Sequence, residues 1–505
     1  MAGMFKRLAS GAAFGGVSFV VAALASLWAT PKLYEGVGAE AYGVLGLLIG
    51  VQGALLLLLS SGGVTATLVL LADGDAQTLK TRGRAMAGWA VLAAALALIA
   101  GWALGTPLLG SIFWHDAMSL DLWLGVAPWA GLSWALQIMC QALWAAQRAR
   151  QRLVQAELQQ GLWQTLAILA GPWALWRGTG FSGIVESQAL AWLLALVAGL
   201  IWEATLPGGL NLMPKEDRPT WRLAWKTAVW TTVALGATGV LLYGDRVFFL
   251  ARGVKELAAY SAATSLSLRA ASLFGLLGPL LLPALSSARN DPERWAGMQS
   301  LVLRTAGIGA GSIFVPLAAG GAVLLGAWVG PEAATFGQAW MVLLAAGGLA
   351  LALSNAYMAV LLGMDGAKQA AFSALAGVAV GVLVGKVAQA HGAQGAVWMG
   401  LAGHTLTVLW RGWAVAKLGL ERPGWGWAWL SLPWLLAAGG GVWVLRALDF
   451  PRWFGLGLVA QLESFAVAGV LIAGLALGAD AMISVPRKRW PLWQQLLRLR
   501  RSPAA

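Results

Sequence analysis

Residues 243–266 read YGDRVFFLARGVKELAAYSAATSL, and this stretch combines the two features that decide the fold. It starts in an apolar run that contains the adjacent residues Asp245 and Arg246, and it continues into GVKELAAYS at 253–261. GVKELAAYS has a counterpart in GVGAEAYG at 36–43. Each of these two segments follows one apolar run and opens the next with a tyrosine, so the first question is whether the runs cross a membrane.

Hydrophobic residues dominate the chain along its whole length. It has 505 residues, of which 59% are hydrophobic and only 11% are charged, and its mean hydropathy is +0.72. A soluble domain carries about 25% charged residues, and a helix needs about 17–25 apolar residues to cross a bilayer. Because runs of that length recur throughout, the sequence predicts an all-α, polytopic membrane protein.

The first apolar run, at residues 8–30, follows Lys6 and Arg7 as the core of a signal peptide would. It is longer than the roughly 7–15 residues of such a core, so we expect an uncleaved first span. The single cysteine, Cys140, lies within another predicted span. One cysteine excludes an intrachain disulfide and a cysteine-based metal site, and we expect no metal and no cofactor.

Fourteen transmembrane helices are predicted, with charged, glycine or proline clusters between them. They lie at about 8–30, 43–71, 85–106, 121–146, 153–176, 184–205, 227–250, 258–285, 299–328, 336–362, 370–390, 395–416, 427–447 and 456–483. The resulting parts are an N-terminal six-helix lobe (1–206), a cytoplasmic linker (207–226), a C-terminal six-helix lobe (227–416), two extra helices (427–483) and a basic amphipathic tail (486–505).

Basic residues are concentrated on one side of this layout. Of the 34 lysines and arginines, 25 lie in alternate loops and at the two ends, at 6–7, 80–84, 148–152, 215–226, 289–304, 368, 411–422 and 487–501. Because cytoplasmic loops carry such an excess, both termini are predicted to be cytoplasmic. The net charge of +13 is therefore a topology signal, and no nucleic-acid partner is expected. The basic tail is predicted to lie on the lipids of the anionic inner leaflet.

The two tyrosine-containing segments belong to a longer internal repeat. One offset of 218 residues separates Tyr42 from Tyr260, Asp73 from Asp291, and Arg150–Gln151 from Lys368–Gln369. A common offset without gaps indicates a duplicated six-span unit. Because six is even, both copies have the same orientation, which predicts a parallel pseudo-twofold repeat about an axis along the membrane normal. This is a transporter architecture with a central site between the halves.

Two segments resemble a known family. KLYEGVGAEAYGVLGLL at 32–48 and the stretch 243–266 are similar to the bacterial polysaccharide-unit (O-antigen) flippase family. Its members have a Gly-x-x-x-(Tyr)-Gly pattern that opens the second span. They also have an Asp-Arg pair, a glycine and then Tyr-x-x-Ala at the junction of spans seven and eight. The matching residues here are Asp245, Arg246, Gly253, Tyr260 and Ala263.

The resemblance implies a two-lobed transporter that switches between inward- and outward-facing states, with spans 1, 2, 7 and 8 lining a cavity. The implied substrate is an undecaprenyl-pyrophosphate-linked oligosaccharide, moved from the cytoplasmic to the periplasmic leaflet of the bacterial inner membrane for polysaccharide or lipopolysaccharide biosynthesis. A polysaccharide polymerase or a chain-length regulator is then a candidate partner. The same multidrug/oligosaccharidyl-lipid/polysaccharide exporter superfamily contains lipid II flippases and multidrug/cation exporters, which are the alternatives.

Asp245 and Arg246 are candidate cavity residues. Consecutive residues point about 100° apart on a helix, so the spacing predicts no direct pairing between them. Arg246 is expected to find partners on another helix, in water or in the substrate. It also lies near the predicted periplasmic end of its span, from which a long basic side chain can reach the interface, and both interpretations stay open. For Asp245 we expect an ion pair with another helix.

Arg269 is the stronger candidate for substrate binding. It lies near the middle of the span predicted at 258–285, where a charge is costly and usually functional. Ser261, Ser265 and Ser272 share its helical stripe. Such a stripe favours a hydrated cavity, and arginine binds pyrophosphate in a bidentate manner. The alternative is a buried arginine that pairs with a carboxylate and holds helices together; we favour the cavity.

Other intramembrane polar groups are weaker candidates. Gln52 is a further cavity candidate, while Glu157 and His404 are candidates for proton coupling. Inter-helix hydrogen bonding is an equally good interpretation of Glu157, Gln160 and Gln164, which share a face. A structural role is the more common one for a histidine such as His404.

The loops argue against an enzyme. A polytopic glycosyltransferase or polysaccharide polymerase would need long periplasmic loops with catalytic clusters, and the predicted loops are short. The sequence contains no nucleotide-binding motif, so ATP is not expected to drive transport directly. A cation exporter would need carboxylates for its guest, whereas the central charge here is Arg269.

Overall fold

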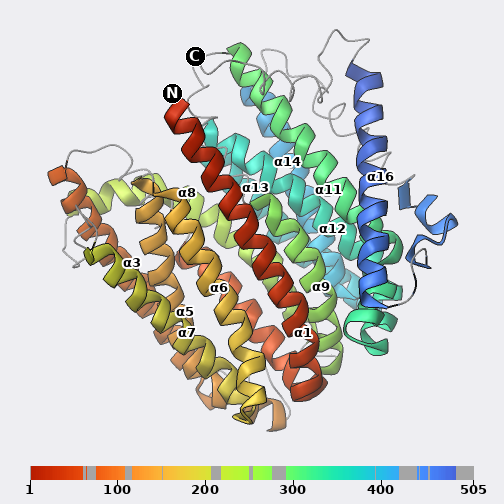
Figure 1. Cartoon of the computed structure of the whole chain (residues 1–505), viewed down its shortest axis with the longest axis horizontal. Helices are drawn as coiled ribbons and strands as arrows, with labels where there is room; N and C mark the ends of the chain where they lie inside the picture. The colour runs from red at the N-terminus through yellow and green to blue at the C-terminus, as the bar shows by residue number, and fades with distance from the viewer. Residues whose placement is uncertain are drawn as a thin grey trace. The chain divides into compact units, whose positions relative to one another are not determined.

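The structure is a computed structural model in which residues 2–60, 64, 76–108, 117–150, 152–205, 218–249, 254–275, 292–364, 366–392, 394–419, 441–442, 444–452, 455 and 457–484 are described. Across these ranges the regular structure is helical and contains no strand. In chain order the α-helices are α1 (Ala2–Leu59), α3 (Ala76–Leu104), α5 (Ala117–Ala149), α6 (Leu153–Trp176), α7 (Gly180–Thr205), α8 (Arg218–Tyr243), α9 (Val254–Gly275), α11 (Pro292–Trp328), α12 (Pro331–Gly363), α13 (Ala367–Ala390), α14 (Gly395–Gly419) and α16 (Leu458–Ser484) (Figure 1). Two short 3₁₀-helices are η1 (Gly244–Phe249) and η2 (Phe450–Arg452).

This helical content confirms the predicted fold class. Where their residues are described, thirteen of the fourteen predicted spans coincide with helix, and eight of the described helices are long and apolar enough to cross a membrane. The spans predicted at 43–71 and 258–285 extend beyond the described residues. The span predicted at 427–447 lies mostly outside the described residues, as does the whole of the tail at 486–505. Helices suit the bilayer because every backbone polar group is satisfied within the segment. The chain is therefore a multi-pass membrane protein.

The first two predicted spans both lie in α1, which is kinked at Gly38. Gly38 has φ 81° and ψ 164°, a backbone conformation that L side chains disfavour and glycine adopts readily. The kink lies within the segment 36–43 that the repeat singled out. The glycine thus supplies the break between the spans that the sequence predicted at 31–42.

The chain divides into two compact units. The first comprises Gly3–Ala258, and the second comprises Ala259–Ala505 with the first two residues. By this division α8 belongs to the first unit, whereas the predicted repeat assigns it to the second lobe. The predicted lobe boundaries, with a linker at 207–226, stay a prediction.

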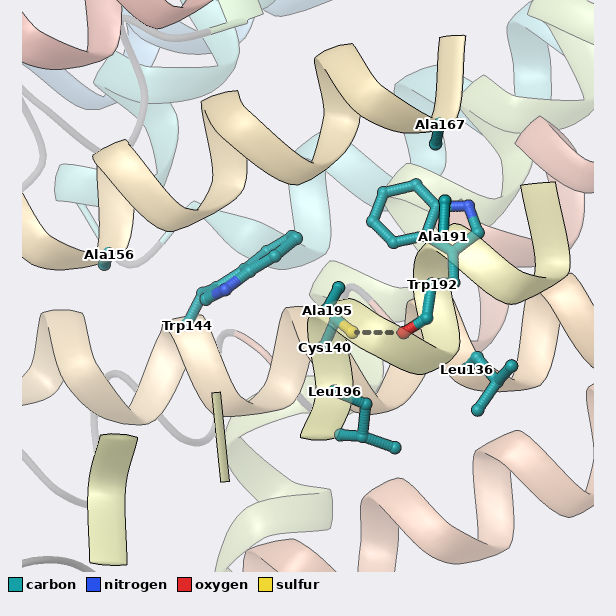
Figure 2. Close-up of a cluster of buried hydrophobic side chains, with 9 residues drawn as sticks. All are labelled: Leu136, Cys140, Trp144, Ala156, Ala167, Ala191, Trp192, Ala195 and Leu196. Carbon is teal, nitrogen blue, oxygen red and sulfur yellow. Dashed lines mark hydrogen bonds between the residues drawn. The ribbon is translucent and has the colours of Figure 1, made fainter. Parts of the chain in front are cut away.

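The core of the first unit lies where α5, α6 and α7 pack against one another. Figure 2 shows this cluster, in which the Trp144 and Trp192 rings lie with their centroids 6.2 Å apart. The Cys140 thiol lies 3.7 Å from the Trp192 carbonyl oxygen. On the other side of α5, α3 approaches so closely that a Cβ on Gly101 would lie 2.2 Å from Gly131 Cα. Small residues at such crossings let membrane helices pack backbone to backbone.

In the second unit, α11 packs on α12 and α16, and α14 packs on both α12 and α13. The short helix η2 packs against α16 and α11, with Phe450 and Phe465 in edge contact at 5.2 Å between ring centroids. Other positions of α16 carry exposed apolar side chains, among them Val470 and Leu475. Such a face is expected of a helix that borders lipid.

The helix order gives a direct test of the predicted topology. We expect reporter fusions at Gly180, where α7 begins, and at Pro331, where α12 begins, to report a periplasmic location. A fusion at Pro214 should report the cytoplasm, because it lies in the basic segment between α7 and α8. Paired phosphatase and fluorescent-protein fusions distinguish the two sides. A cytoplasmic signal at Gly180 would contradict the predicted orientation.

Candidate functional site

The charged pair of the opening stretch lies where α8 gives way to η1. Arg246 Nη1 donates to Asp245 Oδ1 at 3.5 Å and to the Leu242 carbonyl at 3.2 Å. Asp245 is 5% and Arg246 3% exposed. The prediction that these neighbours would not pair was wrong, because the flexible arginine stem lets the guanidinium reach back to the adjacent carboxylate. The burial of Arg246 also excludes the alternative in which its side chain reaches the interface.

Two glycines of α1 make room for this arrangement. A Cβ on Gly50 would lie 2.7 Å from Arg246 Cδ, and one on Gly53 would lie 2.4 Å from the Tyr243 ring. The guanidinium lies over that ring, 5.3 Å from its centroid, a cation–π geometry. Arg246 Nε is buried and has no hydrogen-bond partner. The glycines therefore set how deeply the arginine and the tyrosine pack against α1.

The close contact extends as an antiparallel seam, formed by residues 43–58 of α1 on one side and by residues 236–246 and Val254 on the other. A Cβ on Gly43 would lie 2.4 Å from the Val254 carbonyl oxygen, and one on Gly236 would lie 2.7 Å from Leu58. Beyond the Gly43 end, Lys255 Nζ lies 3.7 Å from Glu40 Oε1. The two copies of the tyrosine-containing repeat thus meet each other at one end of the seam.

Gln52 joins α1 to α5. Its Nε2 donates to Gln137 Oε1 at 2.7 Å, and the Ser60 hydroxyl donates to Gln141 Oε1 at 2.6 Å. Hydrogen bonds of this kind between polar side chains hold membrane helices together. A cavity role for Gln52 stays a prediction.

Glu157 lies in a polar network at the ends of α5 and α6. Arg148 Nε donates to Glu157 Oε1 at 2.8 Å, and the same guanidinium donates to Gln160. The Ser18 hydroxyl of α1 donates to the Glu157 carbonyl at 3.1 Å. This geometry supports the structural interpretation of the glutamate, since an arginine neutralises it. A proton-coupling role stays a prediction.

A second carboxylate, Glu203, was not singled out from the sequence. It is 2% exposed on α7, and its Oε2 lies 3.5 Å from Arg152 Nη1 and 3.8 Å from Arg150 Nη1. Burial, together with the neighbouring charge of Arg152, lowers the pKa of Arg150, while Glu203 opposes that shift. The three arginines at 148, 150 and 152 could have indicated that a carboxylate lies near them. Their spacing was interpreted only as a topology signal.

The serine stripe of α9 contains Arg269. Ser261 is buried and its Oγ has no hydrogen-bond partner, while Ser265 is half-buried and donates to the Ala262 carbonyl at 2.7 Å. Arg269 is half-buried. Ser267 donates to the Leu344 carbonyl of α12 at 3.0 Å. Because Ser267 is roughly 200° around the helix from Arg269, the stripe faces away from α12. The Ser272 side chain lies outside the described residues.

Two arginines that were counted with the cytoplasmic loops are buried in helices, within the spans predicted at 299–328 and 395–416. Arg304 is 4% exposed in α11, and Arg411 is 1% exposed in α14. Counting them as loop charges was wrong. His404, also in α14, is 6% exposed and lies seven residues before Arg411, on the same helical face. Its proton-coupling role stays a prediction.

Comparisons with known proteins identify the fold. No protein-family model and no curated sequence matches the chain. Among solved structures, an inward-facing multidrug resistance MATE family transporter of the MOP superfamily is similar, with a TM-score of 0.64 and 13% identity over 80% of this chain and 96% of that one. The lipid II flippase MurJ in an inward closed conformation gives a TM-score of 0.67 and 10% identity over 91% and 98%. The chain has the fold of MOP superfamily transporters.

The MOP fold accommodates more than one kind of binding pocket. A MOP superfamily transporter from Pyrococcus furiosus, described as having a pocket of reverse polarity that suggests a different function, gives a TM-score of 0.61 and 15% identity. It covers 82% of this chain and 96% of its own length. The fold alone therefore does not specify the substrate.

Proposed function

We propose that this chain is a flippase that moves an undecaprenyl-pyrophosphate-linked oligosaccharide from the cytoplasmic to the periplasmic leaflet by alternating access. Its location would be the bacterial inner membrane, where it would serve polysaccharide or lipopolysaccharide biosynthesis, including O-antigen. The MOP fold supports a transporter. The resemblance of the segments at 32–48 and 243–266 to polysaccharide-unit flippases supports the substrate class. A polysaccharide polymerase or a chain-length regulator would be its partner.

The balance of intramembrane charge is the observation that carries this proposal. In the first unit the carboxylates of Asp245, Glu157 and Glu203 each lie within 4 Å of an arginine nitrogen. A cationic guest would compete with these arginines for the carboxylates. The hydroxyl stripe of α9, by contrast, contains Arg269, whose guanidinium matches a pyrophosphate. An anionic substrate thus fits the described charges better than a cation does.

A lipid II flippase is the second candidate. The lipid II flippase structure aligns with 91% of the chain, against 80% for the MATE transporter. That additional coverage is small, because another MATE structure aligns with 86% of the chain. It leaves open whether the carrier bears a peptidoglycan precursor or a polysaccharide unit.

Reconstitution separates the candidates. Purified protein in liposomes should translocate a fluorescent polyprenyl-pyrophosphate oligosaccharide, measured by the fraction that an externally added reductant can reach. The same vesicles should translocate lipid II at the protein-free rate and should not accelerate the release of a cationic dye. Faster translocation of lipid II than of the oligosaccharide would favour the second candidate. Dye transport without lipid translocation would contradict both flippase proposals.

A further inference from the structure

Three helices of the second unit converge on one buried arginine. Arg411 of α14 donates from Nε to the Ser373 hydroxyl of α13 at 3.0 Å. Its Nη1 donates to the Ser354 hydroxyl of α12 at 2.8 Å and to the Ser354 carbonyl at 3.1 Å. Arg411 and Ser354 are each 1% exposed, and Ser373 is fully buried. The guanidinium is therefore sealed inside a helix bundle, away from water and lipid.

The hydrogen bonds of Arg411 leave part of the guanidinium unsatisfied. The group has five N–H donors, and the three contacts above use those on Nε and Nη1. Nη2 is buried and has no hydrogen-bond partner. Within the residues that the structure describes, Arg411 also forms no ion pair. A buried charge without a partner costs several kcal/mol, so both a positive charge and two donors require compensation.

Two further polar side chains of α14, Thr407 and His404, lie on the helical face that carries Arg411. Thr407 lies one turn earlier on α14, is 2% exposed, and its hydroxyl donates to the Gly403 carbonyl at 2.8 Å. His404 lies on the same face, two turns before Arg411. These side chains supply hydroxyls and an imidazole but no carboxylate. A water molecule would satisfy the free donors of Arg411 without neutralising its charge, whereas an anion would do both.

We propose that the polar cluster of Ser354, Ser373, Thr407 and Arg411 binds a small monovalent inorganic anion, of the chloride class, at Arg411 Nη2. One negative charge balances one guanidinium. An ion at Nη2 would be shielded from solvent, because Ser354, Ser373, Thr407 and Arg411 are each at most 2% exposed. This site is independent of the proposed substrate, since it uses none of the residues of the α8–η1 or α9 regions.

Thermal unfolding of the purified protein tests the site. In detergent at constant ionic strength, exchange of gluconate for chloride or bromide should raise the unfolding midpoint in a saturable manner, because a ligand that binds the folded state stabilises it. Arg411→Gln should weaken this halide dependence by at least about tenfold in apparent affinity. Arg446→Gln is the matched control, because Arg446 lies in the same unit and donates to the Ala318 carbonyl at 3.2 Å. It should retain the wild-type halide dependence.

A second measurement tests the proposal even if Arg411→Gln fails to fold. Crystals of the wild-type protein grown in bromide should show an anomalous peak within hydrogen-bonding reach of Arg411 Nη2. A water at that position in bromide crystals, with no anomalous signal, would overturn the proposal. The same conclusion follows from a halide dependence that is equal in the wild type and in Arg411→Gln.

Discussion

Replacement of Arg269 by alanine is expected to abolish substrate translocation while the protein still reaches the membrane at the wild-type level. The residue lies within α9 on the hydroxyl stripe and is half-buried. A pyrophosphate taken into the membrane needs a fixed cation, and a guanidinium stays protonated at any physiological pH. Hydrogen bonds to charged groups contribute roughly 1.5–3 kcal/mol each, so loss of a bidentate contact should weaken binding by at least about tenfold. Export complementation, with protein level checked by blot, measures the effect.

Two further variants separate charge from geometry. Arg269→Lys should retain part of the activity, because the positive charge survives and the planar fork does not. Arg177→Ala is the control for a general loss of basic residues: Arg177 is exposed, and its guanidinium lies 5.6 Å from the Trp173 ring centroid. It should export at the wild-type rate. Wild-type export by Arg269→Ala at normal protein level would remove this arginine from the mechanism.

The fold was predictable because membrane spans depend on local composition. Each span must be apolar over its own length, so hydropathy locates it without knowledge of its neighbours. The prediction for α12, at 336–362, lies inside the observed Pro331–Gly363. Ends were less accurate where a helix extends beyond the apolar run: α11 begins at Pro292, before the predicted start at 299. Charged residues in that first turn belong to the helix although they interrupt the hydropathy.

The candidate site was less predictable because its contacts join segments distant in sequence. Arg411 lies within the span predicted at 395–416 but was counted with the basic loop residues, and its burial depends on Ser354 and Ser373, contributed by two other helices. The pairing of Asp245 with Arg246 depends on side-chain conformation, which helical spacing does not determine. Sequence reasoning singled out the stretch at α8–η1 but could not assign the partners of its charged residues.

The glycine seam is expected not to tolerate a large side chain at Gly53. A Cβ there would lie 2.4 Å from the Tyr243 ring, so Gly53→Leu must displace the ring and with it the guanidinium of Arg246 that it supports. Overpacking of this kind typically lowers the free energy of unfolding by about 1–3 kcal/mol, even when few carbon atoms are added. A leucine side chain adds four carbon atoms. We expect Gly53→Leu to lose most folded protein, measured as the monodisperse fraction after detergent extraction. Gly53→Ala should fold with a lower unfolding midpoint.

Gly16 provides the control, because it also lies in α1 and a Cβ there would meet nothing within 4 Å. Gly16→Leu should accumulate as the wild type does, so a general intolerance of α1 to leucine would be visible. The double variant Gly53→Ala/Tyr243→Leu should recover part of the midpoint lost in Gly53→Ala, since contacting residues are not additive. An unchanged midpoint in Gly53→Ala would show that the ring is free to move away from α1. In that case the seam would not hold Arg246 in place, and the buried position of its guanidinium would need another cause.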